Sequence, residues 1–140
     1  LIAVGKPRGP LADAARDYEE RIARLTRFDA VEVRDDEPRR EGERILAAAE
    51  GFRLVAFDVA GEAITSEGLA EHVRAWEEQA PQRTAFAIGG AEGLDAAVLG
   101  AASARLSLGA ITLPHQLARV VAAEQLYRAL TILRGHPYHR

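Results

Sequence analysis

The 140-residue chain contains no cysteine and only one lysine, Lys6. Without cysteine it can form neither disulfide bonds nor thiolate metal sites, and this composition is compatible with a cytoplasmic protein. The single lysine leaves no GxxxxGK(S/T) loop, the motif that cradles the phosphates of nucleoside triphosphates. These absences exclude disulfide scaffolds, zinc–thiolate centres and the P-loop class of nucleotide-binding proteins.

Long hydrophobic runs are also absent. No stretch of about 18 apolar residues occurs, so the sequence predicts no membrane span. The first residues, LIAVGK, lack the charged start and long apolar stretch of a signal peptide. Apolar side chains still make up 48% of the chain, enough for a buried core at this length. We expect one globular domain, residues 1–140, that works in the cytoplasm.

The charge balance is slightly acidic, with 21 acidic and 18 basic side chains and a formal net charge of −3. Such a balance argues against a protein that coats nucleic acid along its whole surface. The segment 105–140 differs, because it holds five arginines and three histidines but only one acidic residue, Glu124. Any contact with a polyanion should therefore involve the C-terminal part of the chain.

Short β-branched runs alternate with longer segments of helical periodicity, which predicts an α/β fold with a mostly parallel sheet flanked by helices. Ligands of such sheets bind at the carboxyl ends of the strands. This rule directs attention to residues 57–61, 89–93 and 108–115. The pattern predicts strands at 1–5, 28–33, 52–61, 84–88 and 105–114, helices at 12–25, 66–80 and 115–135, and two shorter helices ending near Ala49 and Ala102.

A glycine-rich turn follows the strand at 84–88, in the stretch TAFAIGGAEGL. Its spacing is GGxxG instead of the GxGxxG of dinucleotide sites, and Glu92 would place a negative charge beside a bound phosphate. A phosphate-free adenosine cofactor such as S-adenosylmethionine fits this turn better. The simpler interpretation is a tight strand–helix turn in which Glu92 stabilises the helix dipole.

The stretch SLGAITLPHQLAR, residues 107–119, contains a second candidate for the cofactor site. Gly109 interrupts a strand pattern and Pro114 lacks an N–H group, which suggests an irregular loop with free main-chain groups. Such groups could hydrogen-bond to the edge of an adenine ring. A plain strand, turn and helix is the alternative.

Titratable side chains gather near the C-terminus. Glu124 and Arg128 have i,i+4 spacing, so they form an ion pair on a helix, either on the surface or partly buried. No histidine pair has a convincing partner for metal binding, and we predict no metal. The terminal HPYHR is either a frayed end or a functional tail, in which Tyr138 stacks on a base and Arg140 contacts a phosphate or a developing anion.

These segments together resemble one family. The motifs IGGAEGL, LSLGAITLPHQLARVVAAEQLYRAL and HPYHR, with LIAVGK and RLVAFDVAG, closely resemble the small SPOUT-class methyltransferases that modify large-subunit ribosomal RNA. The resemblance covers nearly the whole chain. It implies a parallel sheet with helices on both sides, a C-terminal trefoil knot, and a homodimer in which one subunit completes the site of the other.

The resemblance also implies S-adenosyl-L-methionine as cofactor and methyl transfer to N3 of a pseudouridine in 23S rRNA within ribosomes. In this family the cofactor is held largely by main-chain groups of the knotted loops. Phe57 stands where an aliphatic residue is expected in relatives. Carried over by position, the contacts are Phe57, Gly89, Leu108, Gly109, Ala110, Ile111, Thr112 and Leu113.

Our hypothesis assigns the chemistry to the tail. His139 is the candidate base, Arg140 stabilises the substrate anion or anchors a phosphate, and Tyr138 is the stacking platform, with His115 and Arg119 as second candidates. Three alternatives stay open at this point: a SPOUT methyltransferase of tRNA, a catalytically silent module that binds an adenosine ligand, and a dinucleotide-dependent metabolic enzyme.

Overall fold

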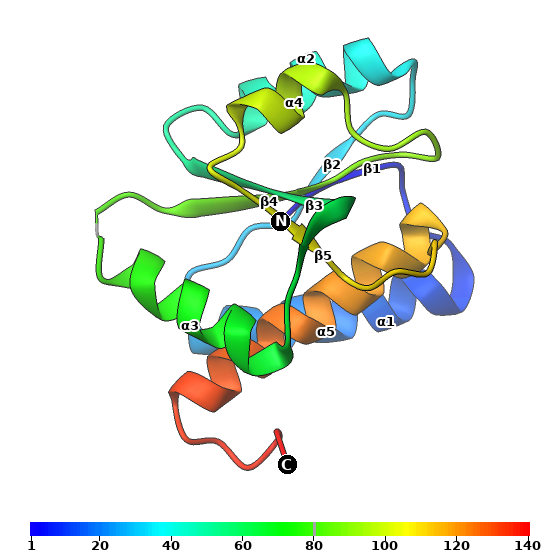
Figure 1. The fold of residues 1–140 in the computed structure, drawn as a ribbon. Coiled ribbons are helices and arrows are strands. Elements are labelled where there is room, and N and C mark those ends of the chain that lie inside the picture. The colour runs from blue at the N-terminus through cyan, green and yellow to red at the C-terminus, as the bar shows by residue number, and fades with distance from the viewer. Residues whose placement is uncertain (80) are drawn as a thin grey trace.

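The computed structural model describes residues 1–79 and 81–140, which form a five-stranded parallel sheet in the order β2-β1-β4-β3-β5 (Figure 1). Helices α2 and α4 cover one face of the sheet, and α1, α3 and α5 cover the other, which confirms the expected α/β architecture. The strands are β1 (Ile2–Val4), β2 (Val31–Val33), β3 (Arg53–Ala63), β4 (Thr84–Ile88) and β5 (Ala104–Ser107); the helices are α1 (Gly9–Leu25), α2 (Pro38–Ala48), α3 (Ser66–Glu77), α4 (Ala96–Ala101) and α5 (His115–Leu133).

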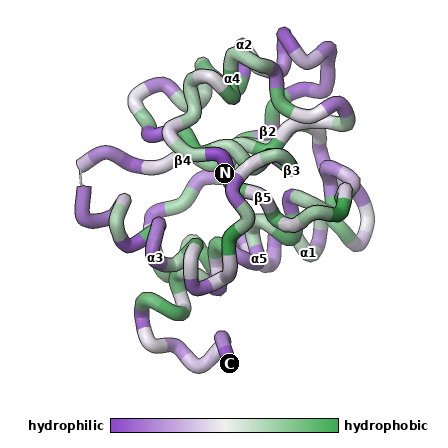
Figure 2. The backbone as a smooth tube through the Cα atoms, in the orientation of Figure 1, coloured by the Kyte–Doolittle hydropathy of each residue, from purple (hydrophilic) through white to green (hydrophobic). Residues whose placement is uncertain are grey.

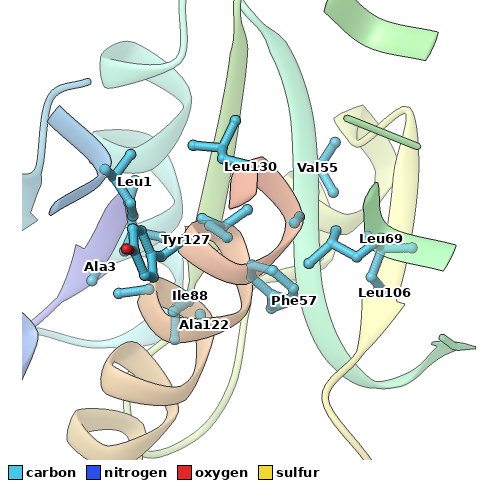
Figure 3. Close-up of a cluster of buried hydrophobic side chains, with 14 of the residues drawn as sticks. Leu1, Ala3, Val55, Phe57, Leu69, Ile88, Leu106, Ala122, Tyr127 and Leu130 are labelled. Atoms are coloured by element: carbon cyan, nitrogen blue, oxygen red, sulfur yellow. The ribbon is translucent and has the colours of Figure 1, made fainter. Parts of the chain in front are cut away.

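The sheet has a hydrophobic cluster on each face, as a parallel sheet buried on both sides requires. Successive side chains of a strand point to opposite faces. In β1, Ile2 and Val4 therefore join the cluster under α2 and α4, while Ala3 joins the larger cluster under α1, α3 and α5. Figure 2 shows hydrophobic stretches along the strands, and helices in which hydrophobic and hydrophilic residues alternate. Figure 3 shows the larger cluster, with side chains of β3, β4 and β5 packed against α3 and α5.

Strand β3 passes β5 at very short range. Phe57 and Glu62 both lie opposite Leu106, so the residues between them leave the regular ladder. A Cβ atom added to Gly61 would lie 2.7 Å from the carbonyl carbon of Arg105, which means that backbone packs directly on backbone here. Only glycine allows such an approach. The trefoil knot stays a prediction, and close crossings of this kind are consistent with it.

Several predicted boundaries were wrong. Strand β5 ends at Ser107 and does not continue to residue 114, because Gly109 has a φ of 134° and its N–H and C=O both bond to the Ser107 hydroxyl. Strand β2 begins at residue 31, not 28, and β3 continues two residues past 61. Helix α1 begins three residues before 12, since proline is tolerated in a first helical turn. Of the predicted helix 66–80, Ala80 lies outside the described residues, and α3 ends at residue 77.

Candidate active site

The three stretches selected from the sequence meet at one edge of the sheet. Phe57 pairs with Ile88 of β4 and with Leu106 of β5 in the strand ladders. Gly89 follows Ile88 directly, and Leu108 comes two residues after Leu106. The carboxyl ends of β3, β4 and β5 therefore bring all the predicted cofactor-binding segments side by side.

The turn at Gly89–Gly93 depends on glycine. A Cβ atom at Gly89 would lie 2.5 Å from the carbonyl carbon of Gly93, and the Gly93 N–H donates to the Gly90 carbonyl over 3.0 Å. Gly93 itself has a φ of 81°. Glu92 is exposed at the tip, but α4 begins only at Ala96 and is capped by Asp95. Since Glu92 is outside the first turn of α4, the interpretation that it stabilises the helix dipole is not supported.

The loop formed by residues 108–113 presents main chain to its surroundings. Within the described residues, the N–H and C=O groups of 110–113 have no hydrogen-bond partner in the protein. Ala110, Ile111 and Thr112 are exposed, and Ile111 retains 78% of its accessible surface. The interrupted strand pattern predicts such free groups, which can read the donors and acceptors of an adenine edge.

The backbone of Phe57 lies in the strand ladders, between Ile88 of β4 and Leu106 of β5. The side chain of Phe57 is buried in the larger cluster (Figure 3), and it stacks on Phe86 at 5.8 Å between ring centroids. The Phe57 ring is therefore part of the core beneath the carboxyl ends of β4 and β5. The side chain of Leu108 is partly buried against the same cluster.

The two second-rank candidates lie in the first turns of α5. The ring of His115 packs on the β1–α1 loop, where a Cβ atom at Gly5 would lie 3.3 Å from Nε2. Arg119 is buried and bound by carboxylates from two other elements, at 2.8 Å to Glu19 of α1 and 3.1 Å to Glu32 of β2. Because its guanidinium is occupied in this way, Arg119 ties α5 to α1 and β2.

The C-terminal tail is docked on the protein, which argues against a frayed end. The Tyr138 hydroxyl donates to Glu124 over 2.9 Å and lies 3.3 Å from the hydroxyl of Tyr18. Arg128 lies over the Tyr138 ring, 4.9 Å from its centroid, and bonds to Glu124 at 2.6 Å. The Glu124 side chain is 18% exposed, so the Glu124–Arg128 pair is partly buried.

Hydrogen bonds also fix the protonation pattern of the tail. Arg128 can only donate, so the His139 Nδ1 atom, 3.2 Å from Nη1, accepts. Nε2 then carries the proton and donates to Glu67 over 3.0 Å. Burial, reinforced by the bonds to Tyr18 and Glu124, raises the pKa of the Tyr138 hydroxyl, so this group stays protonated beyond the range in which an ordinary tyrosine ionises. Arg140 is exposed at the end of the chain.

The structure brings the predicted residues together in two groups. The first group comprises Phe57, Gly89 and residues 108–113, the last of which lead into the start of α5. The second is the tail, which contacts Glu124 and Arg128, about 14 Å and about 20 Å along α5 from His115 at 1.5 Å per residue. No hydrogen bond joins the tail to residues 108–113 within the described part of the chain.

Sequence reasoning missed one residue beside the site. Glu41 of α2 is buried behind the Gly89–Gly93 turn, with 4% of its surface exposed. Its spacing from Ile45, one helical turn later, places it on the buried face of α2 and could have revealed it. Of the residues described, no group of three or more metal-ligand side chains is suitably placed for a metal ion, and none of their helices is long and apolar enough to cross a membrane.

Comparison with known proteins also points to a methyltransferase. The family described as predicted SPOUT methyltransferases matches residues 1–139. The chain is 43% identical over 139 residues to the "Ribosomal RNA large subunit methyltransferase H" of Sorangium cellulosum, covering 99% of this chain and 96% of the relative. It is 44% identical over 141 residues to the protein of that name from Thermus thermophilus, covering 100% of this chain and 96% of the relative.

Two solved structures share the fold. One is a probable methylase family protein from Haemophilus influenzae, with a TM-score of 0.61, 14% identity, and coverage of 99% of this chain and 69% of the other. The second is a probable rRNA-methyltransferase from Porphyromonas gingivalis, with a TM-score of 0.50, 16% identity, and coverage of 95% and 69%. Together with the family match over nearly its full length, the glycine turn and the open loop beside it identify this chain as a member of the SPOUT methyltransferase family.

Proposed function

We propose that this protein is an S-adenosylmethionine-dependent methyltransferase that methylates N3 of a pseudouridine in the 23S rRNA of the large ribosomal subunit. The observation that carries the proposal is the main chain of residues 110–113, whose groups have no hydrogen-bond partner among the described residues and which follow β5 at the same end of the sheet as the Gly89–Gly93 turn, in a chain of the SPOUT family. The names of the relatives support the ribosomal RNA substrate. A ribosomal substrate also implies work in the cytoplasm.

The residues present fit S-adenosylmethionine better than a dinucleotide. Glu92 is exposed at the tip of the turn, and α4 is too short and too far along the chain to offer its N-terminus to a phosphate. A cofactor without phosphate avoids both difficulties. In the proposed complex, Gly89 and residues 108–113 hold the cofactor through main-chain groups, above the buried ring of Phe57. When bound, the cofactor supplies an electrophilic methyl group on a sulfonium.

Methylation of an imide nitrogen requires removal of its proton and alignment with the methyl carbon. The tail offers suitable groups. In the proposed roles, His139 accepts the proton, Arg140 stabilises the resulting anion or anchors a phosphate, and Tyr138 stacks on a base. Burial and its hydrogen bonds raise the pKa of the Tyr138 hydroxyl, so the group stays neutral. A neutral ring is suited to stacking on a base.

The separation of the two groups supports a homodimer. Proton removal and methyl transfer must occur within hydrogen-bonding reach of one base, but the tail contacts α5 about 14 Å to about 20 Å from His115. In addition, Nδ1 of His139, the nitrogen that would accept a proton, is occupied by Arg128. We therefore propose that the tail of one subunit serves the cofactor loop of its partner.

The net charge of −3 bears on how the substrate is recognised. A small acidic domain gains little from long-range attraction to RNA. We propose that the assembled ribosome presents the pseudouridine, so that the dimer reads a folded surface through local basic groups. A free RNA hairpin should then be a poor substrate.

The test is transfer of tritium from labelled S-adenosylmethionine to ribosomes, large subunits, naked rRNA or tRNA from a strain that lacks the enzyme. Label at one pseudouridine, and only on assembled particles, is the expected result. Label on tRNA would show that the protein is a methyltransferase with a substrate other than ribosomal RNA. No label anywhere, with S-adenosylhomocysteine still bound, would instead indicate a silent adenosine-binding module.

A further inference from the structure

Glu41, in the first turn of α2, is the one carboxylate that is buried among the described residues. Its Oε1 atom accepts a hydrogen bond from the Asp36 N–H over 3.0 Å. The three arginines of the same helix are engaged elsewhere: Arg39 pairs with Glu43, Arg40 with Glu37, and Arg44 with Asp36. A buried carboxyl group without a cationic partner is costly, so it is expected to have a task.

The location of Glu41 indicates that task. A Cβ atom built on Gly90 would lie 3.1 Å from both Oε1 and Oε2, so the carboxyl group lies directly against the glycine turn. The next residue, Gly42, packs equally closely on Asp95, where its own Cβ would lie 2.9 Å from the Asp95 Cβ. Asp95 is the N-cap of α4. Two successive residues of α2 therefore contact the beginning and the end of the segment 90–95.

We propose that Glu41 is a positioning residue for the cofactor: its carboxyl group supports the Gly89–Gly93 turn from the α2 face and links it to the loop between β2 and α2 through the Asp36 amide. The inference rests on the proposed function, because it treats this turn as part of the S-adenosylmethionine site. Glu41 does not touch the reacting atoms. It acts through the shape of the turn.

The neutral form of Glu41 suits this position. Burial raises the pKa of Glu41 and the adjacent Asp35 and Asp36 carboxylates add to the effect, while the hydrogen bond from the Asp36 amide opposes them. On the remaining sides, Arg44 pairs with Asp36, Asp95 at the N-cap of α4 packs on the adjacent Gly42, and Val4 of β1 lies with the Glu41 carboxyl group against Gly90 of the glycine turn. Because the pKa of Glu41 is raised in the folded protein, the contribution of its protonated form to stability is present at low pH. That contribution is lost as the pH rises through the raised pKa.

The test measures S-adenosylhomocysteine affinity by titration calorimetry on the full chain, well below the melting temperature of each variant. Glu41→Ala should weaken binding about tenfold or more, because the turn loses its support. Glu41→Gln keeps an acceptor for Asp36 without a charge, and it should bind within about twofold of wild type at a pH below the raised pKa of Glu41. Glu43→Ala is the matched control, since Glu43 is on the same helix but 66% exposed, and it should also stay within about twofold.

The pH profile separates positioning from simple stability. As the pH rises above the ordinary glutamate pKa of about 4.3 and through the raised pKa of Glu41, wild-type affinity should fall relative to that of Glu41→Gln, which cannot ionise. Any histidine that titrates in this window is common to both proteins and cancels in the ratio of their Kd values. A constant ratio would overturn the inference, even if Glu41→Ala failed to fold.

A folded Glu41→Ala protein with wild-type affinity would overturn it as well, and would leave the proposed function intact. Wild-type protein that binds no S-adenosylhomocysteine would instead overturn the proposed function, and the inference with it. The two failures are therefore distinguishable.

Discussion

The main-chain loops, residues 89–93 and 108–113, and the tail, residues 136–140, are built in opposite ways. Apart from Glu92 and Thr112, the loops are made of glycine and small or aliphatic residues, and among the described residues the groups without a partner in 110–113 belong to the backbone. The tail is rich in functional side chains, and Tyr138 and His139 are both held by hydrogen bonds to side chains of other elements. Substitutions that change side chains should therefore be tolerated in the loops and damaging in the tail, whereas the backbone is decisive in the loops.

The same contrast corresponds to the proposed roles: the loops bind the cofactor, and the tail contacts the RNA. Backbone groups have fixed positions once the chain is folded, which suits a cofactor that must bind in the same way in every cycle. Long side chains can be relocated, which suits contacts made only when the RNA arrives. The His139 side chain illustrates this difference, because the nitrogen that would accept a proton is bound to Arg128 in the docked tail. It must leave Arg128 before it can serve as a base.

The largest expected effect comes from changing the backbone of the loops. Gly89→Ala should weaken S-adenosylhomocysteine binding by about 100-fold or more, because the new Cβ would lie 2.5 Å from the Gly93 carbonyl carbon and 2.8 Å from the Leu94 nitrogen. Backbone atoms at these distances must shift. Calorimetric titration measures the loss, and thermal unfolding shows whether the fold survives.

Gly100→Ala is the matched control for this substitution. Gly100 is inside α4 and has nothing within 4 Å of an added Cβ, so alanine should leave binding unchanged and add up to about 1 kcal/mol of stability. If Gly89→Ala bound the cofactor as well as Gly100→Ala, the main-chain loops would not be the cofactor site.

The next largest effect should come from the side chains of the tail. Arg140→Ala and His139→Ala should each lower the rate of methyl transfer at saturating substrate by about tenfold or more, while S-adenosylhomocysteine binding stays within about twofold. The reason is that both side chains are proposed to act on the RNA base and not on the cofactor. Single-turnover assays with labelled S-adenosylmethionine measure the rate.

His136→Ala provides the comparison within the tail, because His136 is exposed and has no proposed role. It should keep nearly full activity. Full activity in both Arg140→Ala and His139→Ala would reduce the tail to an anchor and remove the contrast with the loops.

How far the sequence predicts this structure differs between the same two regions. The periodicity of apolar residues yields the parallel α/β fold, and Gly109 with Pro114 indicates the irregular loop, since these signals are local. The predicted ends of β5 and β3 were wrong. Hydrogen bonds between the Ser107 hydroxyl and Gly109 end β5, and the close approach of Gly61 to the Arg105 backbone sets the course of β3. The docked tail could not be predicted, since Tyr138 meets Tyr18 across most of the chain. The buried position of Glu41 likewise depends on tertiary packing.

The smallest expected effect tests how firmly the tail is docked. Tyr138→Phe removes the hydroxyl that donates to Glu124, which should cost about 1 kcal/mol of stability at neutral pH. Tyr127→Phe is the matched control, since no hydrogen bond of the Tyr127 hydroxyl occurs among the described residues, and it should cost less. Urea unfolding followed by circular dichroism measures both.

The pH dependence of this difference gives the sign of the effect. Burial and the bonds to Tyr18 and Glu124 raise the pKa of Tyr138, so the folded protein favours the protonated hydroxyl. The stabilisation is fully present below the unfolded pKa of about 10 and is lost as the pH rises above it. The stability gap between wild type and Tyr138→Phe should therefore narrow in alkaline solution. A gap that is absent at neutral pH, or that widens above about pH 10, would show that Tyr138 does not hold the tail, and the tail would then be as open as the loop 108–113.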